Sequence, residues 1–204
     1  CVSLLLLCAA TIFSKSTTAN ADDRYVKLCE RYFTEFAEDY GKFGQKDGFT
    51  YLYSDKKNTA TIVAIPMEQK KVAVPGKING KTVTKIELMD VFSCSSNYYF
   101  RDEFYGEHED NPVPKVEYLS IPKTVKVINI YAGIGLTEGY CGELQSYLVH
   151  LKKFNVASAN KWYRSYKGML YTKNGKKLLL VPRKYMAKTV KVKKGTTKIA
   201  DFAF

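Results

Sequence analysis

The sequence repeats itself, and this internal repetition limits what the chain can fold into more than any other feature. One short motif, an aliphatic residue followed by a turn sequence and a second aliphatic residue, occurs three times; its copies begin at Val74, Ile121 and Val192. The starts lie 47 and 71 residues apart, near two and three times a step of about 23 residues, which is typical of stacked-coil architectures. Because each such coil buries its aliphatic residues against its neighbours, we expect the motif residues to form core rather than a functional site.

The chain beyond Phe49 consists of short runs that are typical of β-strands. These runs are rich in β-branched and aromatic residues and too short for stable helices; they read FTYLY, TATIVAI, KKVAV, VEYLSI, FNV, GMLYT, KLLLV and TVKV. Asn174 and Gly175 lie between GMLYT and KLLLV, and this pair favours a tight hairpin in which both turn positions have positive φ. We therefore predict a mainly β structure with short helical or turn segments, and a hairpin at Asn174-Gly175.

The repeated units resemble the BspA-like family of bacterial leucine-rich-repeat proteins. Phe92-Ser93-Cys94 is similar to a recurring step of that family, and many positions near the end match its pattern: Asn160, Tyr163, Ser165, Gly168, Leu170, Tyr171, Leu178, Pro182, Val192, Gly195, Ile199 and Phe204. The resemblance covers residues 49–204 and is looser over 93–111 and 129–146, which are longer and less regular than the family's repeats. It implies a leucine-rich-repeat solenoid of irregular coils of about 23 residues. Because the sequence stops at Phe204 in mid-repeat, we expect this domain to be incomplete at its C-terminus.

The N-terminal region predicts export. Residues 2–13 form an apolar run, and Ala19-Asn20-Ala21 fits a cleavage site, so residues 1–21 are predicted to be a signal peptide. We expect it to be truncated at its start, because the sequence begins at Cys1 without Met or a basic segment. Residues 22–40 have apolar side chains at helical spacing, and we predict a capping helix and loop over residues 22–48. The helix carries both acidic and basic residues, which favours covering an end of the core over lying on a membrane. We expect a secreted or cell-surface protein with no stable membrane insertion of the mature chain.

The charge favours anionic partners. The formal net charge is +12, and a basic surface attracts acidic glycans, anionic polymers and anionic lipid through a field that salt weakens. Only five of the basic residues are arginines, and no zinc-finger, aromatic RNA-binding or helix-turn-helix pattern occurs, so nucleic acid is not expected as a partner. Lysine pairs begin at Lys70, Lys152, Lys176 and Lys193. They form either a basic stripe across stacked repeats or an ordinary solvated surface.

The residue types that carry catalysis or bind metals are sparse. Beyond the signal peptide the cysteines are Cys29, Cys94 and Cys141, without close spacing, so no structural zinc site is expected, while one disulfide or three thiols remain alternatives. The acidic segment over residues 102–110 matches no calcium loop and is interpreted as solvated. His150 lies among apolar neighbours and is expected to be a partly buried structural residue, with no nucleophile motif nearby. We expect no metal, no cofactor and no enzymatic activity.

Aromatic residues are the best candidates for contact with a partner. Five of them fall inside an irregular segment, where the repeat pattern does not assign them to the core; they are Tyr98, Tyr99, Phe100, Phe104 and Tyr105. Tyrosine is favoured at recognition surfaces because it offers a large area at low entropy cost, although these rings can equally fill an enlarged coil. The family resemblance implies binding to host or neighbouring-cell surfaces, and we expect an extracellular protein or an acidic glycan as partner. The alternatives are the substrate-targeting region of a longer secreted hydrolase and a structural spacer.

Overall fold

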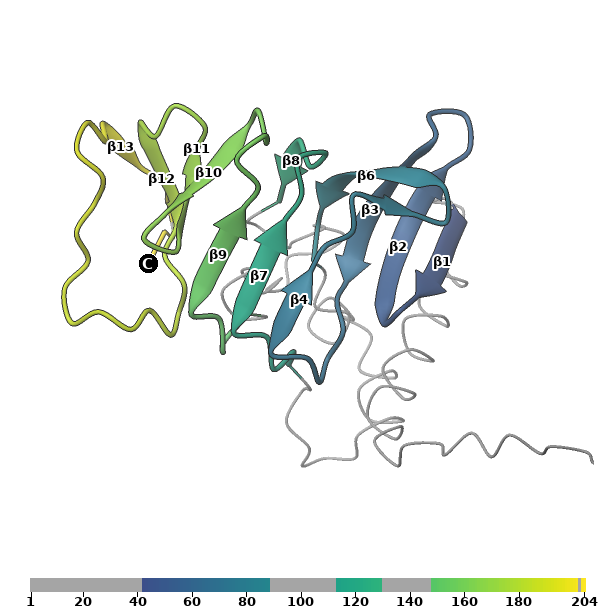
Figure 1. The fold of residues 1–204 in the computed structure, drawn as a ribbon, viewed down its shortest axis with the longest axis horizontal. Coiled ribbons are helices and arrows are strands. Elements are labelled where there is room, and N and C mark those ends of the chain that lie inside the picture. Colours follow the sequence, from purple (N-terminus) through teal and green to yellow (C-terminus); the bar gives the residue numbers. More distant parts are fainter. Residues whose placement is uncertain (1–41, 89–112, 130–147, 202) are drawn as a thin grey trace, which may run out of the picture.

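The computed structural model describes residues 42–88, 113–129, 148–201 and 203–204. Within these ranges the chain forms thirteen β-strands in three sheets and no helix, which confirms the predicted mainly β structure. The sheets follow one another along the long axis of the molecule, from β1 at one end to β13 at the other (Figure 1). The predicted signal peptide, the predicted helix over residues 22–40 and most of the two irregular segments lie outside the described residues.

The first sheet corrects the prediction of a loop over residues 41–48. Its strand order is β1-β2-β3-β6-β5, with β8 also paired to β6; the bounds are β1 Lys42–Lys46, β2 Phe49–Ser54, β3 Thr59–Ala64, β5 Lys77–Ile78, β6 Lys81–Ile86 and β8 Val127–Ile128. β1 pairs antiparallel with β2 along its whole length. Asp47 and Gly48 join the two strands with φ angles of 52° and 78°, the twist that a two-residue hairpin needs. The polar sequence of residues 42–46 therefore forms a strand because it pairs with β2, although its composition alone is typical of a loop.

The second sheet is parallel and joins segments far apart in the sequence. It contains β4 Lys71–Ala73, β7 Tyr118–Ile121 and β9 Lys153–Val156, in the order β4-β7-β9. Val72, Leu119 and Phe154 stand opposite one another in register, and each is at most 2% exposed. Burying an aliphatic or aromatic side chain of this size stabilises the fold by about 2 kcal/mol. This row of core residues holds the three strands at a fixed register.

The first two motif copies lie at the ends of directly paired strands, which corrects the predicted coil of about 23 residues, since paired positions are 47 residues apart between β4 and β7 and 35 apart between β7 and β9. The third copy differs. Val74 and Ile121 are 4% and 2% exposed, and the strands that follow them, β6 and β8, pair in parallel. In the third copy Val192 and Ile199 are 44% and 48% exposed, so the expectation that all motif residues are core is wrong there. Ile199 belongs to β13 Lys198–Ile199, the edge strand of its sheet in the described part of the chain, and Val192 lies in the irregular run that precedes β13 and forms no strand, unlike its counterpart Ile121 in β7.

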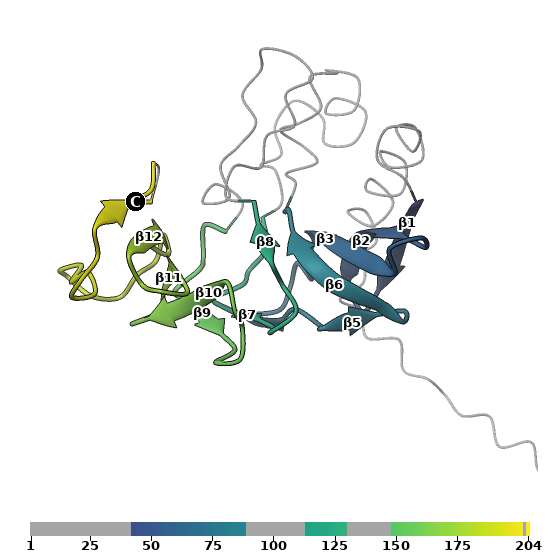
Figure 2. The same cartoon turned by 90° about the horizontal axis from the view of Figure 1, so that it is seen from above.

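The third sheet contains the predicted hairpin. Its strands are β10 Tyr163–Tyr166, β11 Met169–Thr172, β12 Lys177–Leu180 and β13, in that order; seen from above, β7, β9, β10 and β11 lead from the second sheet to the third (Figure 2). β11 and β12 pair antiparallel around Asn174-Gly175, but only Gly175 has positive φ (70°), so the predicted turn type is wrong. Instead, the Asn174 Oδ1 accepts hydrogen bonds from the Lys176 N–H (3.0 Å) and the Thr172 hydroxyl (2.8 Å), which closes a longer loop.

A buried asparagine ties the second sheet to the third. Asn160 is 0% exposed and lies between β9 and β10. Its Nδ2 donates hydrogen bonds to the carbonyl oxygens of Pro122 and Val125, both at 2.9 Å. Its Oδ1 accepts from the N–H groups of Trp162 and Tyr163, both at 2.8 Å. Because all four bonds are formed, this polar side chain is tolerated in the core and fixes the coil after β9 against the turn after β7.

Candidate functional site

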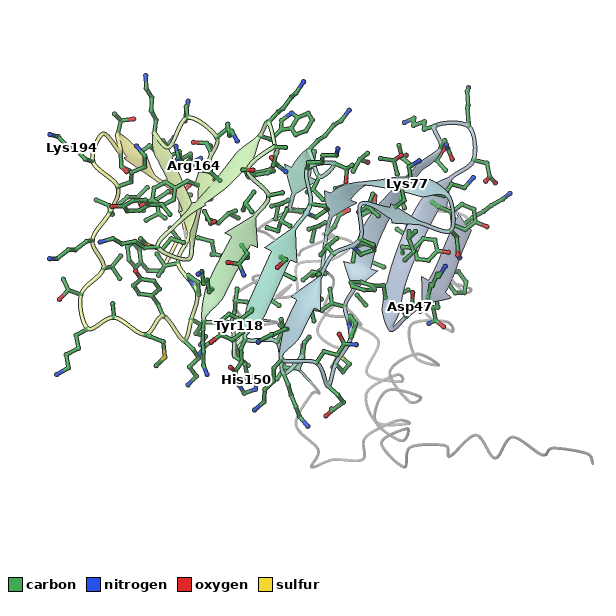
Figure 3. The ribbon with its side chains drawn as sticks, viewed as in Figure 1. Asp47, Lys77, Tyr118, His150, Arg164 and Lys194 are labelled. Atoms are coloured by element: carbon green, nitrogen blue, oxygen red, sulfur yellow. The ribbon has the colours of Figure 1, made fainter. Side chains whose placement is uncertain are left out.

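The positive charge is concentrated in the C-terminal part of the chain. Residues 148–204 contain fifteen lysines and arginines and a single acidic residue, Asp201, whereas residues 1–147 contain seventeen basic and nineteen acidic residues. The formal charge is therefore +14 on the C-terminal segment and −2 on the rest. This segment forms β9 to β13, where the labelled Arg164 and Lys194 lie (Figure 3). A field of one sign over one part of a molecule attracts partners of the opposite sign.

The outer face of the parallel sheet places an aromatic ring between two cations. Lys71, Tyr118 and Lys153 are register partners on β4, β7 and β9, one position before the buried row. Because side chains alternate along a strand, these three point away from the core. The Lys71 Nζ lies 6.0 Å from the centroid of the Tyr118 ring. Neighbouring strands lie about 4.8 Å apart, so the backbones of the two lysines are separated by about 10 Å.

Two shallow concavities meet at Tyr118. One extends over the next outward row of the same sheet, which consists of the short side chains of Ala73, Ser120 and Asn155. The other extends from Tyr118 toward the third sheet; its lining residues are Lys152, Lys153, Lys167, Tyr185, Met186 and Ala187. Met186 is 79% exposed. The face therefore combines a partly exposed ring, three short side chains and several ammonium groups.

A glycine turn supports the basic side of this face. Lys167 and Gly168 join β10 to β11 with φ angles of 51° and 86°. The Gly168 carbonyl accepts a hydrogen bond from the Phe154 N–H at 2.8 Å, which joins the turn to β9. A Cβ at Gly168 would lie 3.0 Å from the Lys153 Cγ, tighter than ordinary van der Waals contact. Glycine is therefore required both for the turn and for the position of the Lys153 side chain.

A carboxylate pairs with Lys152, which lies beside the row, whereas the two lysines of the row and Lys167 have no such pair in the described part of the chain. Lys152 pairs with Glu117 at 2.9 Å. The hydrogen bond from Lys152 lowers the pKa of the Glu117 carboxyl, and the same bond raises the pKa of Lys152. By contrast, Lys71, Lys153 and Lys167 form no ion pair with an acidic residue in the described part of the chain. Two of these ammonium groups lie over aromatic rings, Lys71 over Tyr118 and Lys167 over Tyr166, the latter at 5.7 Å from the ring centroid.

The structure brings together two of the four predicted lysine pairs. Lys71 and Lys153, from the pairs that begin at Lys70 and Lys152, lie in the same row of the parallel sheet. The other two pairs lie in the third sheet and its loops, where Lys177 stands opposite Lys198 in register. Like charges directly opposite each other destabilise a sheet, so an anion bound near this pair would relieve repulsion.

Other predicted site residues are exposed or lie outside the described residues. His150 is exposed, so the prediction of a partly buried structural histidine is wrong; Leu148 and Leu151 fill the core positions on either side of it, each 1% exposed. Residues 98–105, with the five predicted ligand-binding aromatics, fall outside the described ranges, as do residues 102–110 and the three cysteines. In the ranges that are described, no three His, Cys, Asp or Glu side chains cluster as metal ligands, and no helix is long and apolar enough to cross a membrane.

Comparison with known proteins gives two similar solved structures. No protein-family model matches the sequence, and no curated protein matches it. A leucine-rich repeat protein from Eubacterium ventriosum is 21% identical with a TM-score of 0.38, over 63% of this chain and 25% of that one. The pneumococcal vaccine antigen PcpA is 17% identical with a TM-score of 0.32, over 80% of this chain and 62% of that one. The chain thus spans a quarter of the first protein and less than two thirds of the second.

Proposed function

We propose that this chain is a secreted or cell-surface binding module of the leucine-rich-repeat type that holds an anionic extracellular partner, a protein or an acidic glycan, and that it performs no catalysis. The observation that carries this proposal is the separation of charge, since residues 148–204 contain fifteen basic residues and one acidic residue. The apolar run and cleavage pattern over residues 1–21 support the extracellular setting.

The distribution of charge favours binding over simple solubility. A surface that serves solubility intersperses both signs, as the first part of the chain does, where Asp55 pairs with both Lys42 (2.9 Å) and Lys81 (2.7 Å). The C-terminal segment has thirteen lysines and two arginines. Lysine acts as a point charge without the planar fork with which arginine reads guanine, so this composition favours acidic polymers that are held by charge over base-specific recognition of nucleic acid.

The proposal is tested by comparing two triple variants of equal charge. The full chain is titrated with heparin and with neutral dextran at physiological salt. One variant replaces exposed lysines of the basic segment with glutamine, and the control does the same near β1 and β2; the two sets are Lys188, Lys191 and Lys194, and Lys46, Lys56 and Lys57. We expect heparin affinity to fall about tenfold or more in the first variant, about 1.4 kcal/mol, and to change less than about twofold in the second.

Two results would contradict the proposal. If heparin does not bind at physiological salt, the basic segment is not a binding surface for polyanions. If both triple variants weaken binding equally, attraction depends on total charge alone and no particular face is involved.

A further inference from the structure

The row formed by Lys71, Tyr118 and Lys153 suits one kind of anionic polymer better than others. The three positions are 47 and 35 residues apart in the sequence and become neighbours only through the parallel register of β4, β7 and β9. Their backbones lie in line across the strands, about 4.8 Å apart. A ligand that contacts all three side chains must therefore run across the strands. It must present a flat group to the ring of Tyr118 and an acidic group to each lysine.

Tyr118 has the surroundings of a stacking platform. Its side chain is partly exposed, and both concavities extend from it. The face of an aromatic ring is electronegative, so it attracts the polarised C–H groups on the face of a pyranose ring. Beside it, the Ser120 hydroxyl and the Asn155 amide form no hydrogen bond of their own in the described part of the chain. These groups can bond to the hydroxyls at the rim of a sugar.

The position of Tyr118 within the sheet argues against an extended acidic peptide. β7 is the central strand, and β4 and β9 pair with its two edges. A peptide that adds as a strand needs a free edge with unpaired N–H and C=O groups, which β7 does not offer. Recognition at Tyr118 must therefore come from side chains alone.

From this arrangement we propose that the outer face of the parallel sheet binds a linear acidic polysaccharide, with a sugar ring stacked on Tyr118 and acidic groups on either side held by Lys71 and Lys153. Lys167, in the adjoining concavity, continues the cationic track toward the third sheet. The proposal rests on the proposed function, to which it adds the chemical class of the partner. The basic segment supplies attraction for any polyanion, and Tyr118 supplies selection for sugars.

The experiment compares polyanions with and without sugar rings. The full chain is titrated at physiological salt with a chondroitin sulfate oligosaccharide, with polyphosphate and with poly-glutamate of matched total charge. We expect Tyr118→Ala to weaken binding of chondroitin sulfate about tenfold or more, as the loss of an aromatic side chain that anchors a partner does, and to change binding of the two other polymers less than about twofold. Tyr118→Phe retains the ring and should bind chondroitin sulfate within about twofold of the native chain.

The control is a tyrosine-to-alanine substitution at a second tyrosine–lysine pair, in the first sheet. Tyr53 has the Lys81 Nζ 5.9 Å from its ring centroid, in the first sheet, and Tyr53→Ala should leave chondroitin sulfate binding unchanged. Thermal unfolding and the fluorescence of Trp162, the single tryptophan of the sequence, check that each variant is folded.

The possible results separate this inference from the proposed function. If no polyanion binds the native chain, both are overturned. If all three polymers bind equally well and Tyr118→Ala affects them equally or not at all, the basic segment still binds polyanions, but the selection for sugars is refuted. If Tyr118→Phe loses binding as Tyr118→Ala does, the ring is not the recognised group and the stacking arrangement is wrong.

Discussion

Replacing Asn160 with alanine should destabilise the fold more than any other single change to a polar side chain in the described residues. The variant loses four hydrogen bonds and leaves two carbonyl oxygens and two N–H groups without their partner. A buried polar group left unsatisfied costs about 1–3 kcal/mol. Because three of the four bonds are only partly buried, water can satisfy some of these groups, and we expect a total loss of about 3–5 kcal/mol. Such a loss is a large part of the 5–15 kcal/mol that stabilises a typical domain.

Urea denaturation, followed by the fluorescence of Trp162, measures this loss. Asn174→Ala is the matched control, since the Asn174 Oδ1 also accepts two hydrogen bonds but lies in an exposed turn. We expect the control to lose about 1 kcal/mol or less. Should the two variants lose the same free energy of unfolding, Asn160 does not connect the sheets in the way described.

Asn160→Asp tests the contribution of the Asn160 amide donor. The carboxylate keeps the acceptors for the N–H groups of Trp162 and Tyr163 but turns an oxygen, instead of a donor, toward the carbonyls of Pro122 and Val125. Burial and this repulsion should raise the pKa of the new carboxyl above its unfolded value. The variant should therefore be least stable at neutral pH and recover as the pH falls through that raised pKa, where protonation restores a donor. A loss of stability that does not change with pH would contradict this account.

Three further changes have defined outcomes. Gly168→Ala introduces a side chain at a φ of 86° and 3.0 Å from the Lys153 Cγ; it should cost about 1–3 kcal/mol of unfolding free energy in urea and weaken heparin binding. Tyr163→Phe removes the hydroxyl that accepts an N–H from β8 at 3.0 Å and should cost about 1 kcal/mol by the same assay. In the native chain, burial raises the pKa of this phenol, so an ultraviolet titration of the native chain should contain a late tyrosine ionisation that the variant loses. Hydrogen bonds from Lys81 and then Lys42 lower the pKa of Asp55 below its ordinary value of 3.8. The stability that the ionised carboxylate adds is therefore present above that pH and is lost as the pH falls through the lower folded-state pKa. In a pH series of thermal unfolding, Asp55→Asn should reduce the fall of the unfolding temperature at acid pH, and an unchanged fall would refute the pairing.

Local rules predicted part of the fold correctly. The copies at Val74 and Ile121 are buried beside each other because matching aliphatic residues face one core, although their strands pair directly at a separation of 47 residues and not through coils of about 23. The hairpin at Asn174-Gly175 forms because the glycine supplies the positive φ that its turn needs. In both cases the signal lies within a few residues of the structure it predicts.

The sequence did not predict the features that depend on contacts between segments far apart in the chain. Residues 42–46 form a strand only because β2 lies beside them, and Val192 is exposed although its motif matches the buried copies, because it lies in no strand of the described sheets. The row of Lys71, Tyr118 and Lys153 depends on the register of three strands, which the sequence does not reveal without the lengths of the intervening coils. The separation of charge, by contrast, is present in the sequence itself, since residues 148–204 contain fifteen basic residues and one acidic residue.

We propose that an anionic partner binds the outer face of the parallel sheet and residues 148–204, and not the rest of the surface. NMR chemical-shift perturbation on the full chain tests this location of binding most directly. A heparin hexasaccharide is added at physiological salt and the shifts are assigned to residues. We predict that the shifts concentrate on the outer face of β4, β7 and β9 and on residues 148–204, and that β1, β2 and β3 are unaffected. Shifts centred on β1 to β3, or spread evenly over the described residues, would contradict the account.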